Sequence, residues 1–206
     1  MTNSSSRSGY RAQRPLLAIL GGVAVDGIGR RKKEREQMGK EKLIKSKERV
    51  KKHAEVFTPA HIVDAINDLC EPELSNIKSR LLEPACGEGA FLKDVLRRRL
   101  KNCQTPFACL VAVSNIYGVD IQGDNVCKCR WGLYDILLGK FKELGVEDDL
   151  ELNKAALRII TGNIVLGDTI NHPGGVQFTM YEPIEDGAGF KYGEITLAEM
   201  IKEENE

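Results

Sequence analysis

The sequence lacks the marks of several protein classes. No run of apolar residues approaches the roughly 18 that a membrane-spanning helix needs. The six cysteines include no C-x-x-C pair, and the "CKC" at 127–129 has neither a second pair nor a nearby histidine, so we predict no zinc or other metal site. Free thiols in a chain of this size predict a reducing compartment, and we expect a cytoplasmic protein that does not enter a membrane.

The formal net charge is zero, but the basic and acidic residues are unevenly distributed along the chain. The 206 residues carry 30 Lys and Arg against 30 Asp and Glu. Residues 1–52 hold 15 of the basic residues and 5 of the acidic ones, a net +10, and the remainder carries −10. Two interpretations are open: a basic arm that touches nucleic acid, or a solvated and partly disordered tail.

The N-terminal region has little that predicts a fold. The apolar stretch "PLLAILGGVAV" (15–25) follows three arginines but lacks a small-x-small cleavage site, so we do not interpret it as a signal peptide. "RRKKEREQM" then ends at Met38, and purine-rich codons there would resemble a ribosome-binding site. Our hypothesis is that residues 1–37 are a disordered or over-extended segment, followed by a basic helix over 38–54.

Residues 55–170 show alternating strand and helix patterns. Thr58 and Pro59 predict a helix start with a hydroxyl cap and proline at the first helical position. The inner face of that helix is expected to hold Ile62, Val63, Ile66 and Leu69. Buried strands are predicted at 80–83, 116–121 and 162–168, with helices at 90–101, 105–115, 124–141 and 148–160. The pattern predicts an α/β fold with a parallel sheet covered by helices.

The tail, residues 171–206, has a different pattern. "VQFTMYEPI" alternates like a half-exposed strand, and "EDGAG" predicts a turn. Thr196 and Glu199 form a capping box before a short final helix.

The candidate ligand-binding residues follow the ends of three predicted strands. After the first strand comes "EPACGEG", in which Gly87 and Gly89 let a backbone approach a ligand; the dinucleotide pattern is absent because Leu92 stands at the third glycine position. The second strand ends at Asp120, which can accept from ribose hydroxyls, and the third at Asp168, which can accept from an adenine amino group. Alone, each of these is equally a tight turn or a helix cap.

Four segments together resemble a family. "EVFTPAHIVDAI", "LLEPACGEGAFL", "IYGVDI" and "NIVLGD" are similar to motifs X, I, II and III of the bacterial DNA adenine-N6 methyltransferases of restriction–modification systems. The resemblance covers about residues 45–170. It implies a Rossmann-like fold and S-adenosylmethionine as cofactor.

The resemblance also implies a role for each matching residue. Phe57, Thr58 and Pro59 would line the methionine end of the cofactor. The first strand end would wrap the methionine and sulfonium through Glu83, Pro84, Ala85, Gly87 and Gly89. Asp120 would hold the ribose hydroxyls, Ile121 would lie against the adenine, and Asp168 would accept from its amino group.

The family's catalytic motif, [N/D/S]-P-P-[Y/F/W], is missing. The nearest strings are "INHPGG" (170–175) and "MYEPI" (180–184), and neither has the double proline followed by an aromatic residue. We therefore assign no catalytic residue, and in particular neither Asn171 nor Tyr181. A complete sheet of this family has about seven strands, whereas three parallel strands and one or two in the tail are predicted here.

Three hypotheses remain open. The chain is the cofactor-binding half of a split methyltransferase, which reaches DNA through a partner subunit or missing half, with a second methyltransferase or restriction subunit as possible partner. Alternatively, it is a non-catalytic cofactor-binding or regulatory remnant. A small-molecule methyltransferase is the third hypothesis, and no acceptor pocket in the sequence favours it.

Overall fold

A parallel sheet lies at the centre of the computed structural model, which describes residues 16–18, 58–184 and 189–204. Its strands are β1 (Leu16–Ala18), β2 (Arg80–Glu83), β3 (Ile116–Asp120) and β4 (Ile164–Leu166), in that spatial order. All neighbouring pairs are parallel. The strands β2, β3 and β4 confirm the three predicted strands, whereas β1 lies in the range 1–37, where we predicted none.

Four helices cover one face of this sheet, and a fifth packs on one of them. The four are α3 (Ala90–Leu100), α4 (Pro106–Ser114), α5 (Gly123–Glu143) and α6 (Leu150–Asn163), and α2 (Ala60–Leu69) packs on α3. A short 3-10 turn, Glu73–Ser75, precedes β2. Each parallel strand from β2 to β4 is added on the same side of the previous one, and right-handed crossovers then place the connecting helices on a common face. The larger core forms there, where Leu81, Ile116 and Ile164 meet α3, α4, α5 and α6.

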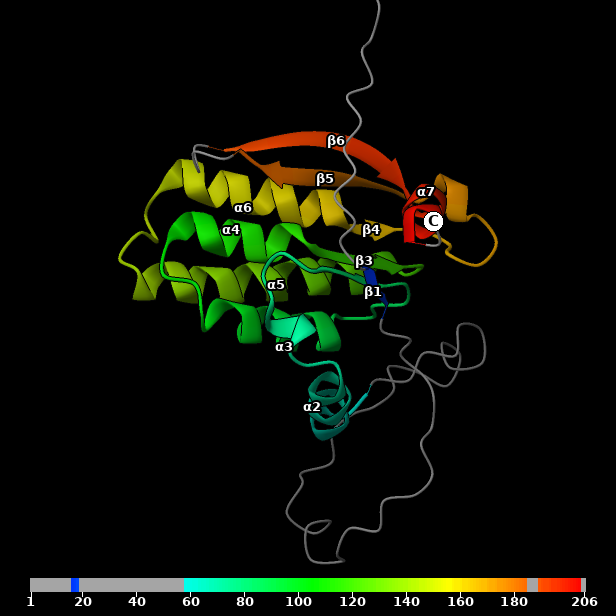
Figure 1. Ribbon diagram of the computed structural model, residues 1–206, viewed down its shortest axis with the longest axis horizontal. Coiled ribbons are helices and arrows are strands. Elements are labelled where there is room, and N and C mark those ends of the chain that lie inside the picture. The colour runs from blue at the N-terminus through cyan, green and yellow to red at the C-terminus, as the bar shows by residue number, and fades with distance from the viewer. Residues whose placement is uncertain (1–15, 19–57, 185–188, 205–206) are drawn as a thin grey trace, which may run out of the picture.

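The tail covers the opposite face. A second 3-10 turn, Pro173–Gly175, leads into an antiparallel hairpin of β5 (Gln177–Pro183) and β6 (Phe190–Thr196), which is followed by α7 (Leu197–Glu204). Leu82, Tyr117 and Val119 point to this side because side chains alternate along a strand. The rings of Tyr117 and Phe178 meet edge to face with centroids 5.4 Å apart. Figure 1 shows the hairpin at the top of the molecule, alongside α6.

The start of α2 corrects one prediction. Pro59 is the N-cap, with φ −60° and ψ 147°, and no side chain caps the helix, so Thr58 is not the hydroxyl cap that we expected. The predicted inner face was also too wide, because Leu69 is 84% exposed and Ile62 is 39% exposed. Within the described residues, α3 is the main neighbour of α2, and the contact is centred on the buried Val63.

Other helix ends agree with the sequence patterns. At α7, the backbone amide of Thr196 donates to the Glu199 carboxylate at 2.9 Å, and the amide of Glu199 donates to Thr196 Oγ1 at 3.2 Å, which confirms the capping box. Asp149 Oδ1 caps α6 by accepting from the amide of Leu152 at 3.0 Å.

Four predictions lie wholly or mostly outside the described residues: the disordered or over-extended segment over 1–37 apart from β1, the basic helix over 38–54, Phe57 of the "FTP" segment, and the turn at "EDGAG" (185–189). Among the helices that the structure describes, none combines the length and apolar character needed to cross a bilayer.

Candidate functional site

The carboxyl ends of β2, β3 and β4 meet and are tied together by hydrogen bonds. The amide of Cys86, after β2, donates to the carbonyl of Val119 at 2.8 Å. The amide of Gly167, after β4, donates to the carbonyl of Asp120 at 3.1 Å, and Thr169 Oγ1 donates to the carbonyl of Pro84 at 3.3 Å. The three loops that the sequence singled out therefore form one surface.

Asp120 is the centre of this surface. Its Oδ2 accepts from the amide of Gly87 at 2.9 Å, and its Oδ1 accepts from the amide of Gln122 at 2.8 Å and from Asn125 Nδ2 at 3.2 Å. The carboxylate thus fixes the glycine loop to the first turn of α5. Because each carboxylate oxygen has about two acceptor sites, Oδ2 keeps one for a further donor.

The glycine loop turns through two left-handed residues. Gly87 has φ 56° and Gly89, the N-cap of α3, has φ 81°. A Cβ on Gly89 would lie 2.4 Å from Cys129 Sγ of α5, so this glycine is required by packing between helices. Gly87 is half-buried and Ala85 is exposed, so the accessible part of the loop is its first half.

Gly118, in the middle of β3, allows Leu92 and Cys86 to pack closely against the strand next to the glycine loop. A Cβ there would lie 2.8 Å from Leu92 Cδ1 and 3.2 Å from Cys86 Sγ. The sequence analysis missed this residue, although a glycine inside a strand pattern signals a close approach.

Cys86 is buried behind the loop and contacts Cys129. Its pKa is raised well above the ordinary value by the hydrogen bond with Cys129, by burial, and by the nearby carboxylates of Asp120 and Glu83. A thiol held neutral in this way is a packing residue and not a nucleophile. Glu83 is itself only 1% exposed, so protein encloses its carboxylate.

Asp168 lies at the surface just beyond β4 and organises a turn. Its Oδ1 accepts from the amides of Ile170 and Asn171 at 3.1 and 2.9 Å, and its Oδ2 accepts from Asn171 Nδ2 at 2.7 Å. The hydrogen bonds from Asn171 lower the pKa of this carboxyl. It is an ionised, accessible acceptor near the other strand ends.

Exposed apolar side chains lie at the ends of β3 and β4. Ile121 is 52% exposed, Leu166 is 60% exposed and Ile170 is 87% exposed. Leu166 is the register partner of Asp120. The sequence analysis selected Ile121 and missed the other two, since a strand residue such as Leu166 is ordinarily expected inside.

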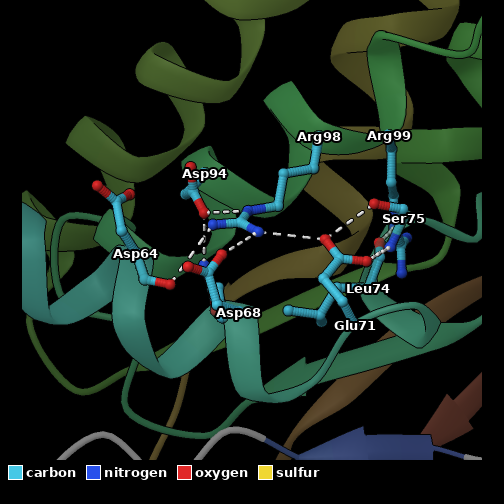
Figure 2. A network of polar contacts seen from close by, with 9 residues as sticks. Asp64, Asp68, Glu71, Leu74, Ser75, Asp94, Arg98 and Arg99 are labelled. Atoms are coloured by element: carbon cyan, nitrogen blue, oxygen red, sulfur yellow. Dashed lines mark hydrogen bonds and ion pairs between the residues drawn. The ribbon is translucent and has the colours of Figure 1, made fainter.

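A cluster around Arg98 holds α2 against α3 and so places the residues that follow Phe57 (Figure 2). Arg98 Nε donates to Asp94 at 2.6 Å, and its Nη1 donates to Asp68 at 2.8 Å and to Glu71 at 3.2 Å. Asn67 Nδ2 also donates a hydrogen bond to the Asp94 carboxylate at 2.8 Å. Thr58 and Pro59 stand half-buried just before α2.

The two strings nearest to a catalytic motif do not come together as one. Asn171 bonds to Asp168, whereas Tyr181 lies on β5 with its hydroxyl 3.4 Å from the carbonyl of Arg158. We assign a catalytic role to neither residue. Within the described ranges, no cluster of three or more His, Cys, Asp or Glu side chains could hold a metal ion.

Comparisons of the chain with protein-family models, with curated proteins and with solved structures find no match.

Proposed function

We propose that the chain is the S-adenosylmethionine-binding part of a DNA adenine-N6 methyltransferase, and that a partner or missing half completes it. The observation that carries the proposal is the meeting of Asp120, Asp168 and the glycine loop at the carboxyl ends of adjacent parallel strands. Ligands of open α/β sheets bind at such edges. The resemblance of the four sequence motifs supplies the identity of the cofactor and of the reaction.

The residues at this surface fit such a cofactor chemically. The free acceptor site on Asp120 suits a ribose hydroxyl, and the exposed Ile121 and Leu166 suit the flat apolar faces of an adenine. The ionised Asp168 is an acceptor for an exocyclic amino group. When bound, S-adenosylmethionine would supply the methyl group on its sulfonium. The chain's own part is to bind and orient it.

The same geometry assigns Asp120 two tasks. Its hydrogen bond to Gly87 shapes the loop, and its remaining acceptor site would bind the ligand that we propose. Pro84 and Ala85 would take part through the backbone, since the loop leaves them accessible. For the enclosed Glu83, a part in binding the methionine or sulfonium stays a prediction.

A second candidate is a non-catalytic cofactor-binding module. The separation of Asn171 and Tyr181 favours it, because neither the described tail nor the strand ends present an acceptor and a ring to one flipped base. Both candidates bind the cofactor, and they differ in whether a partner restores methyl transfer.

Calorimetric titration of the full chain with S-adenosylmethionine tests the proposal. We expect saturable binding of one molecule, weakened about tenfold or more in Asp120→Ala, because a hydrogen bond to a charged group is worth about 1.5–3 kcal/mol. Asp135→Ala, which removes an exposed carboxylate from α5, is the matched control and should bind as the unmodified chain does.

Thermal melting of Asp120→Ala must accompany the titration, since the change also releases the Gly87 amide. Absence of binding by the unmodified chain would refute the proposal. Unchanged affinity in a folded Asp120→Ala would remove this residue from the site.

A further inference from the structure

A groove separate from the strand ends lies between α6 and the β5–β6 hairpin. Its volume is about 760 Å³, within the usual range for small-molecule sites. Its wall residues include Arg158 and Thr161 from α6, and Thr179, Tyr181, Tyr192 and Glu194 from the hairpin. The lining residues of α6 come shortly before β4 begins, so the groove is at the opposite end of that strand from Asp168.

Two tyrosines form one side of the groove. Tyr181 and Tyr192 are register partners across the hairpin, so their side chains project from the same face about 5 Å apart at Cβ. Tyr181 is fixed, because its ring packs edge to face on Phe190 and its hydroxyl donates to the carbonyl of Arg158 at 3.4 Å. Tyr192 is 76% exposed and presents an accessible ring.

A cation lines the same groove as these rings. Arg158 is exposed, and among residues 58–184 and 189–204 no carboxylate forms an ion pair with it. Burial raises the pKa of Tyr181 and the Arg158 charge opposes that rise, as expected for close neighbours. The acid in the wall, Glu194, is held by Gln177 Nε2 at 2.7 Å. The hydroxyl groups of Thr161 and Thr179 add neutral polar contacts.

We propose that this groove binds a nucleotide unit, with its base stacked on Tyr192 and its phosphate paired with Arg158. Aromatic rings accept the face of any base, and a guanidinium pairs with phosphate through two parallel hydrogen bonds. A free mononucleotide and a single strand of DNA share this chemistry. The proposal concerns a second site and does not depend on cofactor binding at the strand ends.

The test uses the full chain at about 0.2 M salt, which suppresses unspecific binding by basic segments. Binding of a fluorescein-labelled oligodeoxyadenylate is followed by anisotropy, and binding of deoxyadenosine monophosphate by calorimetry. We expect Tyr192→Leu to weaken binding at least about fivefold, the lower end of the worth of one stacked base. Arg158→Gln should also weaken nucleotide binding. Tyr192→Phe, which keeps the aromatic ring, should bind as the unmodified chain does.

Two controls remove similar groups elsewhere. Trp131→Leu takes away an exposed ring from α5, and Arg97→Gln takes away an exposed charge from α3. Binding of the oligonucleotide alone identifies a strand as the ligand, and binding of the mononucleotide identifies the free nucleotide. The proposal is overturned if neither ligand binds, or if Tyr192→Leu and Arg158→Gln bind no more weakly than the two controls.

Discussion

At the scale of single residues, the side chain of Arg99 connects three segments of the fold. It is fully buried in α3, and its three donor groups reach three segments: Nε donates to the carbonyl of Leu74 at 3.0 Å, Nη1 to Ala112 at 3.0 Å and Nη2 to Ser79 at 2.7 Å. Burial lowers its pKa to about 10, which leaves it charged at neutral pH. The last turn of α4 supplies one of these carbonyls, where a helix favours a cation.

We predict that Arg99→Met lowers the free energy of unfolding by about 3 kcal/mol or more, because it leaves buried carbonyls without donors. Urea denaturation followed by circular dichroism measures this. Arg97→Met, two residues earlier and exposed, is the matched control and should change stability by less than about 0.5 kcal/mol. Equal stability of the two variants would contradict the role given to Arg99.

The glycine loop gives a second prediction at this scale. Gly89→Ala should cost roughly 2–4 kcal/mol, because it combines a left-handed backbone with a Cβ only 2.4 Å from Cys129 Sγ. In the double variant with Cys129→Ala, part of that loss should return, since the sulfur is gone. Additive losses in a double-mutant cycle would show that the two residues do not press on each other.

At the scale of elements, α2 is the part held mainly by polar contacts. Its only buried apolar side chain is Val63, beside the half-buried Ile66, and the Arg98 cluster with Asp68, Glu71 and Asp94 adds polar contacts to α3 (Figure 2). Arg98 is mostly covered, and of its partners only Asp68 is well exposed. Salt screens exposed ion pairs strongly and partly buried ones much less. The polar part of the attachment of α2 to α3 therefore depends on the Arg98 cluster, which lies at the end of α2 away from Thr58 and Pro59.

We predict that Arg98→Met raises hydrogen exchange in α2 several-fold while α3 and β2–β4 keep their protection. About 1 M salt should raise exchange in α2 of the unmodified chain by a smaller factor, because screening acts mainly on the exposed pair with Asp68. Arg97→Met serves again as the control. Exchange in α2 that stays constant under both treatments would contradict a polar attachment.

The elements also show what sequence patterns can and cannot predict. The strands at Arg80, Ile116 and Ile164 were predictable because short apolar runs end in turn residues, and the capping box marked the start of α7. The exposure of Leu69 was not predictable from the sequence, because periodicity identifies an apolar helix face but not how much of that face another element covers. The strand β1 lies inside the apolar stretch at 15–25, which the sequence analysis compared only with a signal peptide.

The candidate site also has features that the sequence predicts and features that it does not. Asp120 and the glycine loop were predictable from their place at strand ends, and the bond between them was not, since it joins residues 33 apart in sequence. The packing demand on Gly89 depends on Cys129 of another helix, and the groove at Tyr192 arises only when the hairpin meets α6. Such pairings are set by tertiary structure.

At the scale of the whole molecule, the described sheet runs in one direction from β1 to β4, with helices on one face and a hairpin with α7 on the other. A doubly wound sheet reverses its strand order and places helices on both faces. The described sheet shows no such reversal, and the candidate cofactor surface lies at its carboxyl edge.

From this we predict that the purified chain alone transfers no methyl group to adenine in DNA. Transfer requires acceptors and a ring around the flipped base, and proximity gains nothing for a base that is not held. A tritiated-methyl assay on mixed-sequence DNA, with and without lysate of the source organism, tests this. Robust transfer by the isolated chain would show that the tail holds a catalytic group after all, with Asn171 and Tyr181 the first to mutate.

The most direct test of the central claim is a map of backbone amide shifts by nuclear magnetic resonance as S-adenosylmethionine is added to the full chain. We predict saturable shifts at Gly87, Glu88, Ile121 and Asp168, and none at Thr161 or Tyr192 in the groove. Shifts that are absent, or that fall on the groove and leave the strand ends unchanged, would contradict a cofactor site at the carboxyl edge of the sheet.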